Sequence, residues 1–241
     1  MDKFTITGGG RLKGTVQVSG AKNAALPILA GALLCDGPSR IADVPDLSDI
    51  RSMSELLGEL GAAVSRDGEG RMRIVVEDEG ESHARYERVR KMRASICVLG
   101  PLLARRKKVR VAMPGGCAIG ARPVDLHLRG LEAMGAEIEL DGGDILATAR
   151  KLTGTNIFLG GPFGSTVLGT ANVMMAATLA DGTTVIESAA CEPEIQDLAT
   201  FLNAAGARVS GAGTPRVTIE GVDELAGCEH TVIPDRIEAG T

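Results

Sequence analysis

The chain has 241 residues, of which 44% are hydrophobic and 24% charged, and its formal net charge is −5. This composition is typical of a soluble globular protein, and the negative charge does not favour nucleic acid or an anionic membrane as a partner. The sequence contains no Trp, one Tyr and four Phe, which argues against base-stacking platforms and predicts an aliphatic core. Its apolar runs, such as residues 24–34, contain Pro or Gly and are too short to span a bilayer.

Three stretches of about 70 residues repeat one order of elements. Each has an apolar helix rich in small residues, a strand, an amphipathic helix and two strands joined by a polar turn. The apolar helices are expected at 24–34, 94–104 and 171–180, and the strands after them at 39–44, 108–113 and 183–188. The strand pairs are expected at 63–66 with 72–77, 136–140 with 144–148, and 208–210 with 216–220.

The amphipathic helices end in a shared phrase, Leu-x-x-x-Gly-Ala, with its glycine at Gly61, Gly135 and Gly206. Glycine suits the left-handed position that stops a helix. Pro123 and Pro193 suit the first turns of the second and third of these helices. The basic run 105–108 is expected to form a solvated turn.

The apolar helices are apolar on nearly all faces, so one repeat cannot bury its own helix. We therefore expect the three repeats to pack around a shared core. The sequence predicts an α/β domain (α+β in some schemes) with pseudo-threefold symmetry, with the apolar helices inside and the sheets and amphipathic helices outside.

Strand phrases at 12–18 and 152–158 precede the first and third apolar helices, and residues 225–232 have the same shape. A fourth apolar helix would be expected to follow, but the sequence stops at Thr241. We therefore expect the sequence to be the front part of a longer protein.

The five cysteines are widely spread and contain no CxxC pair, so neither a disulfide framework nor a zinc site is expected, and a reducing cytoplasm is the expected location. Cys117 lies in a glycine-rich loop with Arg122 five residues on, and a nearby cation makes a thiol reactive. An ordinary surface loop with an inert cysteine is the alternative interpretation. The other four, Cys35, Cys97, Cys191 and Cys228, are interpreted as small packing residues.

Five motifs resemble those of the UDP-N-acetylglucosamine enolpyruvyl transferases (1-carboxyvinyltransferases): residues 19–27, 91–96, 114–127, 192–195 and 234–238. The resemblance runs from Met1 to Thr241. It implies an inside-out α/β barrel of three pseudo-symmetric repeats, one of two such domains with the active site between them. By this resemblance residues 1–21 would belong to the partner domain, residues 22–230 would form the three-repeat domain, and residues 231–241 would begin the rest of the partner domain, which is missing here.

The resemblance also implies a reaction and a set of residues. The enolpyruvyl group of phosphoenolpyruvate would pass to the 3-hydroxyl of UDP-N-acetylglucosamine with release of phosphate, the first committed step toward peptidoglycan precursors, without a metal or organic cofactor. Lys22 and Asn23 would contact phosphoenolpyruvate and the reacting sugar, and Arg93 would bind the anionic substrates. Cys117 would protonate the enol carbon or add to it, and fosfomycin-type epoxides would alkylate it. The nucleotide sugar would be lined by Arg122, Pro123, Val124, Asp125 and Leu126, with His127, Ser165, Thr166 and Val167 nearby; Arg122 would also serve catalysis.

Each assignment has a simpler alternative in the residues themselves. Lys22 could be solvated, Asn23 a helix cap, and Arg93 the partner of a surface carboxylate. Asp125 could serve the helix dipole, and His127 could be a satisfied helix residue. At the level of function, the alternatives are a relative that acts on shikimate 3-phosphate and a non-catalytic half-protein that binds nucleotide sugars.

Overall fold

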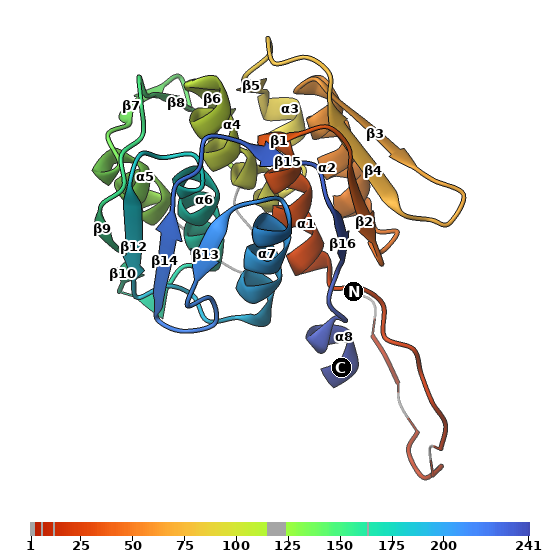
Figure 1. Cartoon of the computed structure of the whole chain (residues 1–241). Helices are drawn as coiled ribbons and strands as arrows, with labels where there is room; N and C mark the ends of the chain where they lie inside the picture. Colours follow the sequence, from red (N-terminus) through yellow and green to blue (C-terminus); the bar gives the residue numbers. More distant parts are fainter. Residues whose placement is uncertain (1–2, 6, 12, 115–123, 163) are drawn as a thin grey trace.

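Three sheets surround a group of apolar helices in the computed structural model, which describes residues 3–5, 7–11, 13–114, 124–162 and 164–241 (Figure 1). The first sheet is β16 (Glu229–Thr231), β2 (Ser39–Ala42), β4 (Met72–Val76) and β3 (Ala62–Arg66). The second is β5 (His83–Ala84), β6 (Lys108–Ala112), β8 (Asp144–Thr148) and β7 (Glu137–Asp141). The third is β9 (Asn156–Phe158), β12 (Thr183–Glu187), β14 (Arg216–Glu220) and β13 (Arg208–Ser210).

The three sheets share one topology. In each, the first pair of strands as written above is parallel, and the other two pairs are antiparallel. The nine strands expected in the three repeats are therefore confirmed, with shifts of one or two residues at their ends. The first sheet takes its parallel edge strand, β16, from the far end of the chain, and β15 (Leu225–Ala226) likewise pairs with β1 (Cys35–Asp36). The last segment of the chain thus completes the sheet that the first segment begins.

The apolar helices form the core, as their composition predicts. They are α1 (Lys22–Gly31) with η1 (Ala32–Leu34), η2 (Arg93–Val98) with α4 (Leu99–Arg106), and α6 (Val167–Ala177). Every residue from Ala24 to Leu34 and from Ser95 to Ala104 is buried, as is every residue from Gly169 to Ala177. The second and third helices approach closely, because a side chain at Gly100 would meet the backbone oxygen of Asn172 at 2.3 Å.

The amphipathic helices α2 (Ser48–Glu59), α5 (Asp125–Ala133) and α7 (Pro193–Ala204) pack against this core. Their shared ending is confirmed: Gly61, Gly135 and Gly206 have φ values of 86°, 95° and 106°, in the left-handed region. Pro193 lies in the first turn of α7 as expected, and Pro123 lies outside the described residues. Several short elements were not expected from the sequence, among them β1, β5, α3 (Tyr86–Val89) and the hairpin of β10 (Gly160–Gly161) with β11 (Gly164–Ser165).

Two expectations from the sequence are wrong. Residues 13–18 form no strand, because no other strand of the described chain lies beside them to take their hydrogen bonds; residues 13–17 are exposed and Val18 is half-buried. The basic run is not simply a solvated turn: Arg105 donates to the carbonyl of Leu34 at 2.9 Å and to Asp36 at 2.5 Å, and Arg106 donates to the carbonyl of Leu60 at 2.8 Å. These arginines end α4 and connect the second repeat to the first.

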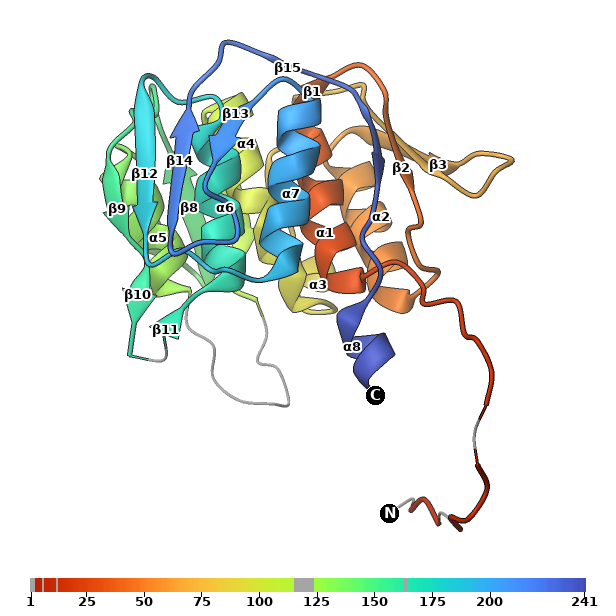
Figure 2. The same ribbon diagram turned by 60° about the horizontal axis from the view of Figure 1, so that its bottom comes forward.

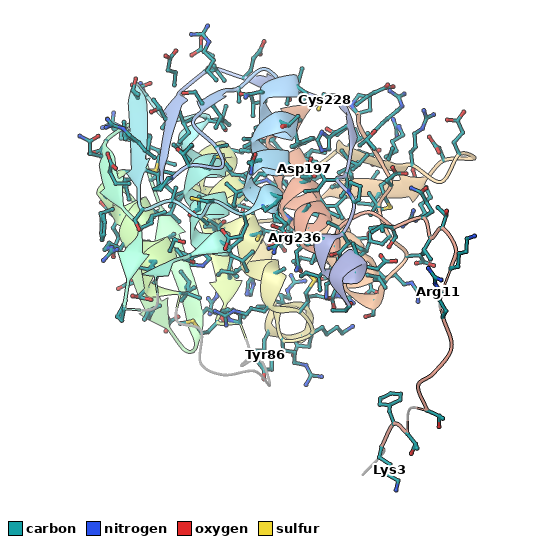
Figure 3. The ribbon with its side chains drawn as sticks, turned by 90° about the horizontal axis from the view of Figure 1, so that it is seen from below. Lys3, Arg11, Tyr86, Asp197, Cys228 and Arg236 are labelled. Atoms are coloured by element: carbon teal, nitrogen blue, oxygen red, sulfur yellow. The ribbon has the colours of Figure 1, made fainter. Side chains whose placement is uncertain are left out.

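The first and last segments of the described chain lie on the same side of the body, where α8 (Arg236–Gly240) also lies (Figure 2). Gly20 forms an antiparallel bridge with Pro234, and the Ala21 amide donates to the Ile233 carbonyl at 2.8 Å. Lys3 and Arg11 belong to the N-terminal segment, which extends away from the body (Figure 3). None of the helices in the described residues is both long enough and apolar enough to cross a membrane.

The close packing of α4 on α6 predicts that Gly100→Ala destabilises the fold by roughly 1–3 kcal/mol, because the added methyl group meets backbone that cannot move aside. The matched control is Gly58→Ala in α2, where an added methyl group meets nothing within 4 Å. That change should stabilise the protein by about 0.5–1 kcal/mol through helix propensity. Urea unfolding of both variants measures the two effects, and equal effects would contradict the packing described.

Candidate functional site

A cavity of about 480 Å³ opens where the buried helices begin. It is lined by the first two residues of α1, of η2 and of α6, which are Lys22 with Asn23, Arg93 with Ala94, and Val167 with Leu168. The rest of its lining is Leu26, Pro27, Asp49, Arg90, Lys91, Met92, Glu192, Glu194 and Arg236. A volume of this size suits a small molecule, and the starts of α1 and α6 favour negative charge through the helix dipole. The structure therefore brings together four of the residues expected at the site: Lys22, Asn23, Arg93 and Val167.

Lys22 is the first residue of α1, and its ammonium group lies 2.8 Å from the carboxylate of Asp49 in the first turn of α2. Both side chains are about one-third exposed, at 36% and 31%, so the pair faces the cavity and an anion can reach it. Lys22 is therefore not simply a solvated side chain. Asn23 is not the helix cap, because Ala21 occupies that position and Asn23 is the exposed second residue of the helix.

Cations outnumber carboxylates among the lining residues. The cations are Lys22, Arg90, Lys91, Arg93 and Arg236, and the carboxylates are Asp49, Glu192 and Glu194. Arg236 makes a forked ion pair with buried Glu194, at 3.0 Å and 3.3 Å. Lys91 lies 3.6 Å from Glu55, and the guanidinium of Arg90 lies 5.9 Å from the centre of the Tyr86 ring. The surplus of positive charge suits an anionic ligand of small size.

A second group of expected residues lies at the start of α5 and beside the hairpin of β10 and β11. Val124 is buried, Asp125 is exposed in the first turn of α5, and Leu126 packs against Gly161 of the hairpin. Arg129 holds the hairpin to α5 by donating to the carbonyls of Phe158 at 2.6 Å and Gly160 at 3.1 Å.

After the hairpin, Ser165 is exposed and Thr166 caps α6 by accepting a hydrogen bond from the Gly169 amide at 3.2 Å. Val167, the first residue of that helix, lines the cavity. The other residues of the second group, from Val124 to His127 with Ser165 and Thr166, lie outside the cavity lining, in the same region of the fold as one another.

His127 connects the two groups through Asn172, a buried residue of α6. The Asn172 amide nitrogen donates to the carbonyl of Ile96 and to Nδ1 of His127, each at 2.9 Å. Its oxygen accepts from the Gly100 amide at 2.8 Å, which fixes the direction of the side-chain amide. His127 is therefore a satisfied helix residue, and in its neutral form the ring proton is held at Nε2.

Burial, together with the nearby charge of Arg93, lowers the pKa of His127 from 6.5 to about 4, although the carboxylate of Asp125 acts in the opposite direction. Arg93 thus lies close enough to both the cavity and the α5 region to act electrostatically on each. At neutral pH the imidazole of His127 is uncharged, so it can donate or accept a hydrogen bond but adds no positive charge.

Cys117, Arg122 and Pro123 lie outside the described residues. Among the other cysteines, burial raises the pKa of Cys35 and Cys97 to about 12, so both are poor nucleophiles at neutral pH. Burial also raises the pKa of Cys228. Cys191 is exposed, so its interpretation as a packing residue is wrong: it follows the last buried residue before α7 and faces solvent. Within the described part of the chain, no three His, Cys, Asp or Glu side chains gather as a metal site would require.

Several lining residues were not identified from the sequence as site residues. Lys91, Glu192, Glu194 and Arg236 lie in the motifs quoted above, and their charge within those motifs was a usable signal. Asp49 and Arg90 carried no such signal, because a charged residue on an amphipathic helix or in a connecting turn is usually solvated. Only the packing of α2 and of the turn after α3 against the start of α1 brings them to the cavity.

The lowered pKa of His127 predicts a stability that depends on pH. Between pH 6.5 and 4 the unfolded chain binds a proton at this residue and the folded chain does not, so the stabilisation is complete above pH 6.5 and is lost as the pH falls toward 4. The loss should reach at most about 3 kcal/mol. Urea unfolding at several pH values should show a weaker dependence in this window for His127→Gln than for the original protein. Equal dependence would contradict the assignment.

Comparison with known proteins gives consistent results. The sequence profile of the EPSP synthase (3-phosphoshikimate 1-carboxyvinyltransferase) family matches residues 6–241. The chain is 57% identical to a UDP-N-acetylglucosamine 1-carboxyvinyltransferase of Methylacidiphilum infernorum, with all of this chain and 57% of the relative covered. It is 54% identical to the protein of the same name from Akkermansia muciniphila, with all of this chain and 56% of the relative covered. The chain thus spans a little over half the length of these relatives.

Solved structures of similar fold include the enolpyruvyl transferase NikO from Streptomyces tendae, with a TM-score of 0.81 and 25% identity, over 96% of this chain and 54% of that one. An EPSP synthase from Acinetobacter baumannii has a TM-score of 0.71 at 17% identity, over 92% of this chain and 50% of that one. The second likeness concerns the fold alone. The α/β arrangement described above is therefore that of the enolpyruvyl transferases.

Proposed function

Because the chain belongs to the EPSP synthase (3-phosphoshikimate 1-carboxyvinyltransferase) family, we propose that it forms one wall of an enolpyruvyl transferase site. The proposed reaction transfers the enolpyruvyl group of phosphoenolpyruvate to the 3-hydroxyl of UDP-N-acetylglucosamine. The oxygen of the 3-hydroxyl bonds to the carbon of phosphoenolpyruvate that bears the phosphate, and the bond from that carbon to the phosphate oxygen breaks. Overall, the hydroxyl proton passes to the phosphate that leaves. The observation that carries the proposal is the cation-rich cavity at the starts of the buried helices.

Both proposed substrates are anions, which the cavity suits. Lys22 and Arg93 would hold phosphate or carboxylate oxygens by charge-assisted hydrogen bonds, and Asn23, exposed beside Lys22, would bond to the reacting sugar. The Lys22–Asp49 ion pair keeps the ammonium group at the cavity without burying it. An anion would compete with Asp49 for Lys22, and this exchange is possible because both side chains remain partly exposed.

We propose that the nucleotide part lies along the start of α5 and the hairpin. Val124, Asp125 and Leu126 would line it together with Arg122 and Pro123, and His127, Ser165, Thr166 and Val167 would lie nearby. The support is that the members of this set which the structure describes gather in one region next to the cavity. Because the proposed substrate is a nucleotide sugar, the proposal includes a role in the synthesis of peptidoglycan precursors and a cytoplasmic location for this step.

Cys117 would supply the thiol that protonates the methylene carbon of phosphoenolpyruvate or adds to the carbon that bears the phosphate. Arg122 would stabilise the thiolate form of Cys117. We also propose that residues 22–230 form an inside-out barrel of three pseudo-symmetric repeats. Residues 1–21 and 231–241 would belong to a partner domain. The shared strand order of the three sheets and the pairing of residues 19–21 with 233–235 support this arrangement.

A shikimate 3-phosphate transferase is the second candidate, since the matching family profile carries that name. The relatives of more than half identity carry the nucleotide-sugar name instead, and they favour the first candidate. Calorimetric titration of this chain with UDP-N-acetylglucosamine and with shikimate 3-phosphate distinguishes the two. We expect heat of binding with the nucleotide sugar only. Binding of shikimate 3-phosphate alone would reverse the assignment.

Turnover should require a C-terminal portion of the kind that the longer relatives contain. Acid–base chemistry needs groups within hydrogen-bond reach on both sides of the substrate, and the cavity described here is one wall. We expect this chain alone to release little phosphate from phosphoenolpyruvate in the presence of UDP-N-acetylglucosamine. Joined to the C-terminal portion of a relative, it should reach the range of enzymes, a kcat of ~1–1000 per second. Lys22→Met should abolish that turnover, whereas Lys151→Met, at an exposed ion pair with Asp181, should not. Rapid phosphate release by the chain alone would contradict the proposal, as would an active Lys22→Met.

An epoxide phosphonate or a mild alkylating agent should label Cys117 before any other cysteine. The protein used is this chain joined to the C-terminal portion of a relative. Cys191 is the informative rival, because it is exposed and so accessible to the reagent, whereas Cys35 and Cys97 are buried. Mass spectrometry after brief treatment measures the order. Cys191→Ser should leave the first labelling event unchanged, and Cys117→Ser should remove it. Labelling of Cys191 or Cys35 before Cys117 would show that Cys117 is not the reactive thiol.

A further inference from the structure

Helix α7 carries two buried carboxylates on one face. Glu194 and Asp197 are each 4% exposed, and they stand three residues apart, which places them side by side on a helix. A buried carboxylate is costly unless it is paired or hydrogen-bonded, so the partners of these two groups show what they hold in place.

The two oxygens of Asp197 hold β16 and the segment that follows it. One oxygen lies 3.0 Å from Nε2 of His230, and the other accepts a hydrogen bond from the Ile233 amide at 3.2 Å. His230 is itself fixed by an edge contact with the ring of Phe201, at 5.8 Å between centroids. With Asp197 ionised, His230 must donate from Nε2, so this carboxylate also selects the form of the imidazole.

The segment held by Asp197 is bonded in turn to the start of α1. The carbonyl of Ile233 accepts from the Ala21 amide at 2.8 Å, one residue before Lys22. The Asp235 amide donates to the Ser19 carbonyl at 2.8 Å, and Gly20 bridges to Pro234. On its other side Gly20 lies against the carbonyl of Asp43, since a side chain there would meet that oxygen at 1.7 Å. The position of the Lys22 backbone is therefore coupled to the position of the Ile233 peptide.

The same segment ends at the other buried carboxylate of α7, Glu194. Three residues after Ile233, Arg236 begins α8 and forms its forked ion pair with Glu194 at the rim of the cavity. Figure 3 labels Asp197 of α7 and Arg236 of α8, the two helices that the ion pair between Arg236 and Glu194 joins. One face of α7 thus fixes both ends of residues 230–236, and through them two cations of the cavity.

We propose that Asp197, which does not line the cavity, is a positioning residue for Lys22 and Arg236. This inference rests on the proposed function, since its consequence is the binding of phosphoenolpyruvate by these cations. Asp197 acts through the peptide of Ile233: it holds that peptide in the orientation that accepts from Ala21, and so sets where α1 begins. The α5 region is reached by a different network, through Asn172, and is independent of Asp197.

The test compares Asp197→Ala and Asp197→Asn with Asp181→Ala, an exposed aspartate paired with Lys151. The alanine variant loses both hydrogen bonds. The asparagine variant keeps an oxygen for the Ile233 amide, while its NH2 group forces His230 to accept at Nε2 and carry its proton at Nδ1. Hydrogen exchange measures directly whether the backbone before Lys22 is still held in place. We expect the amides of Ala21 and Ile233 to exchange at least tenfold faster in Asp197→Ala, with little change in Asp197→Asn or in α5 and α6.

Ligand binding then measures the consequence for the affinity of the cavity for phosphoenolpyruvate. With UDP-N-acetylglucosamine present, Asp197→Ala should weaken phosphoenolpyruvate binding at least tenfold. It should weaken the binding of the nucleotide sugar much less, because Asn23 is the one expected sugar contact at the start of α1, whereas general destabilisation would weaken both alike. Asp197→Asn should restore most of the affinity, and nitrogen NMR should show the changed tautomer of His230. Unchanged exchange at Ala21, or faster exchange with unchanged phosphoenolpyruvate affinity, would overturn the inference. If Asp197→Ala does not fold, an unchanged His230 tautomer in Asp197→Asn would overturn it. Failure of the original chain to bind either ligand would instead overturn the proposed function, and the exchange experiment would still decide the positioning.

Discussion

The burial of three helices that have no polar face is the constraint on which this structure depends. A helix that is apolar all round must be covered all round, and no single repeat has enough surface to do this. Around α1, α4 and α6 the three sheets and the amphipathic helices supply the cover, and small residues let the helices approach one another. Gly100 lies against the backbone of α6, and Gly130 of α5 lies against Val173 of the same helix.

The same constraint locates the chemistry. Charged side chains are excluded from the middle of these helices and lie at their ends, and Lys22 and Arg93 are the first residues of α1 and η2. The helices begin at one side of the body, which turns three separate sequence positions into neighbours around one cavity. The carboxylates of Asp49 and Glu194 then hold Lys22 and Arg236, respectively, without neutralising the cavity as a whole. Core packing and site geometry are thus two results of one pattern.

Most of the fold could be predicted from the sequence, because the evidence for it is periodic and repeated. The left-handed glycines at 61, 135 and 206 and the alternation within the strands each appear three times, so chance is a poor explanation. The short strand β5 could not be predicted, since a strand of two residues shows no alternation of apolar and polar side chains. For the site, Lys22, Asn23, Arg93 and Val167 were placed by resemblance and lie together, but their partners could not be deduced. The pairing of Lys22 with Asp49, or of Asp197 with His230, depends on how distant elements pack, and a single sequence holds no local record of it.

The side-by-side course of residues 19–21 and 233–235 has a consequence for the body between them. The chain enters and leaves that body at neighbouring points, so the intervening residues have the geometry of an insert, which can be grafted into a loop of an unrelated host without stretching either partner. The same proximity would let a short artificial linker join the two points, with new ends opened in an exposed turn such as residues 67–70. Evolution could assemble longer proteins from such a unit by the same route, since neither operation disturbs the buried helices.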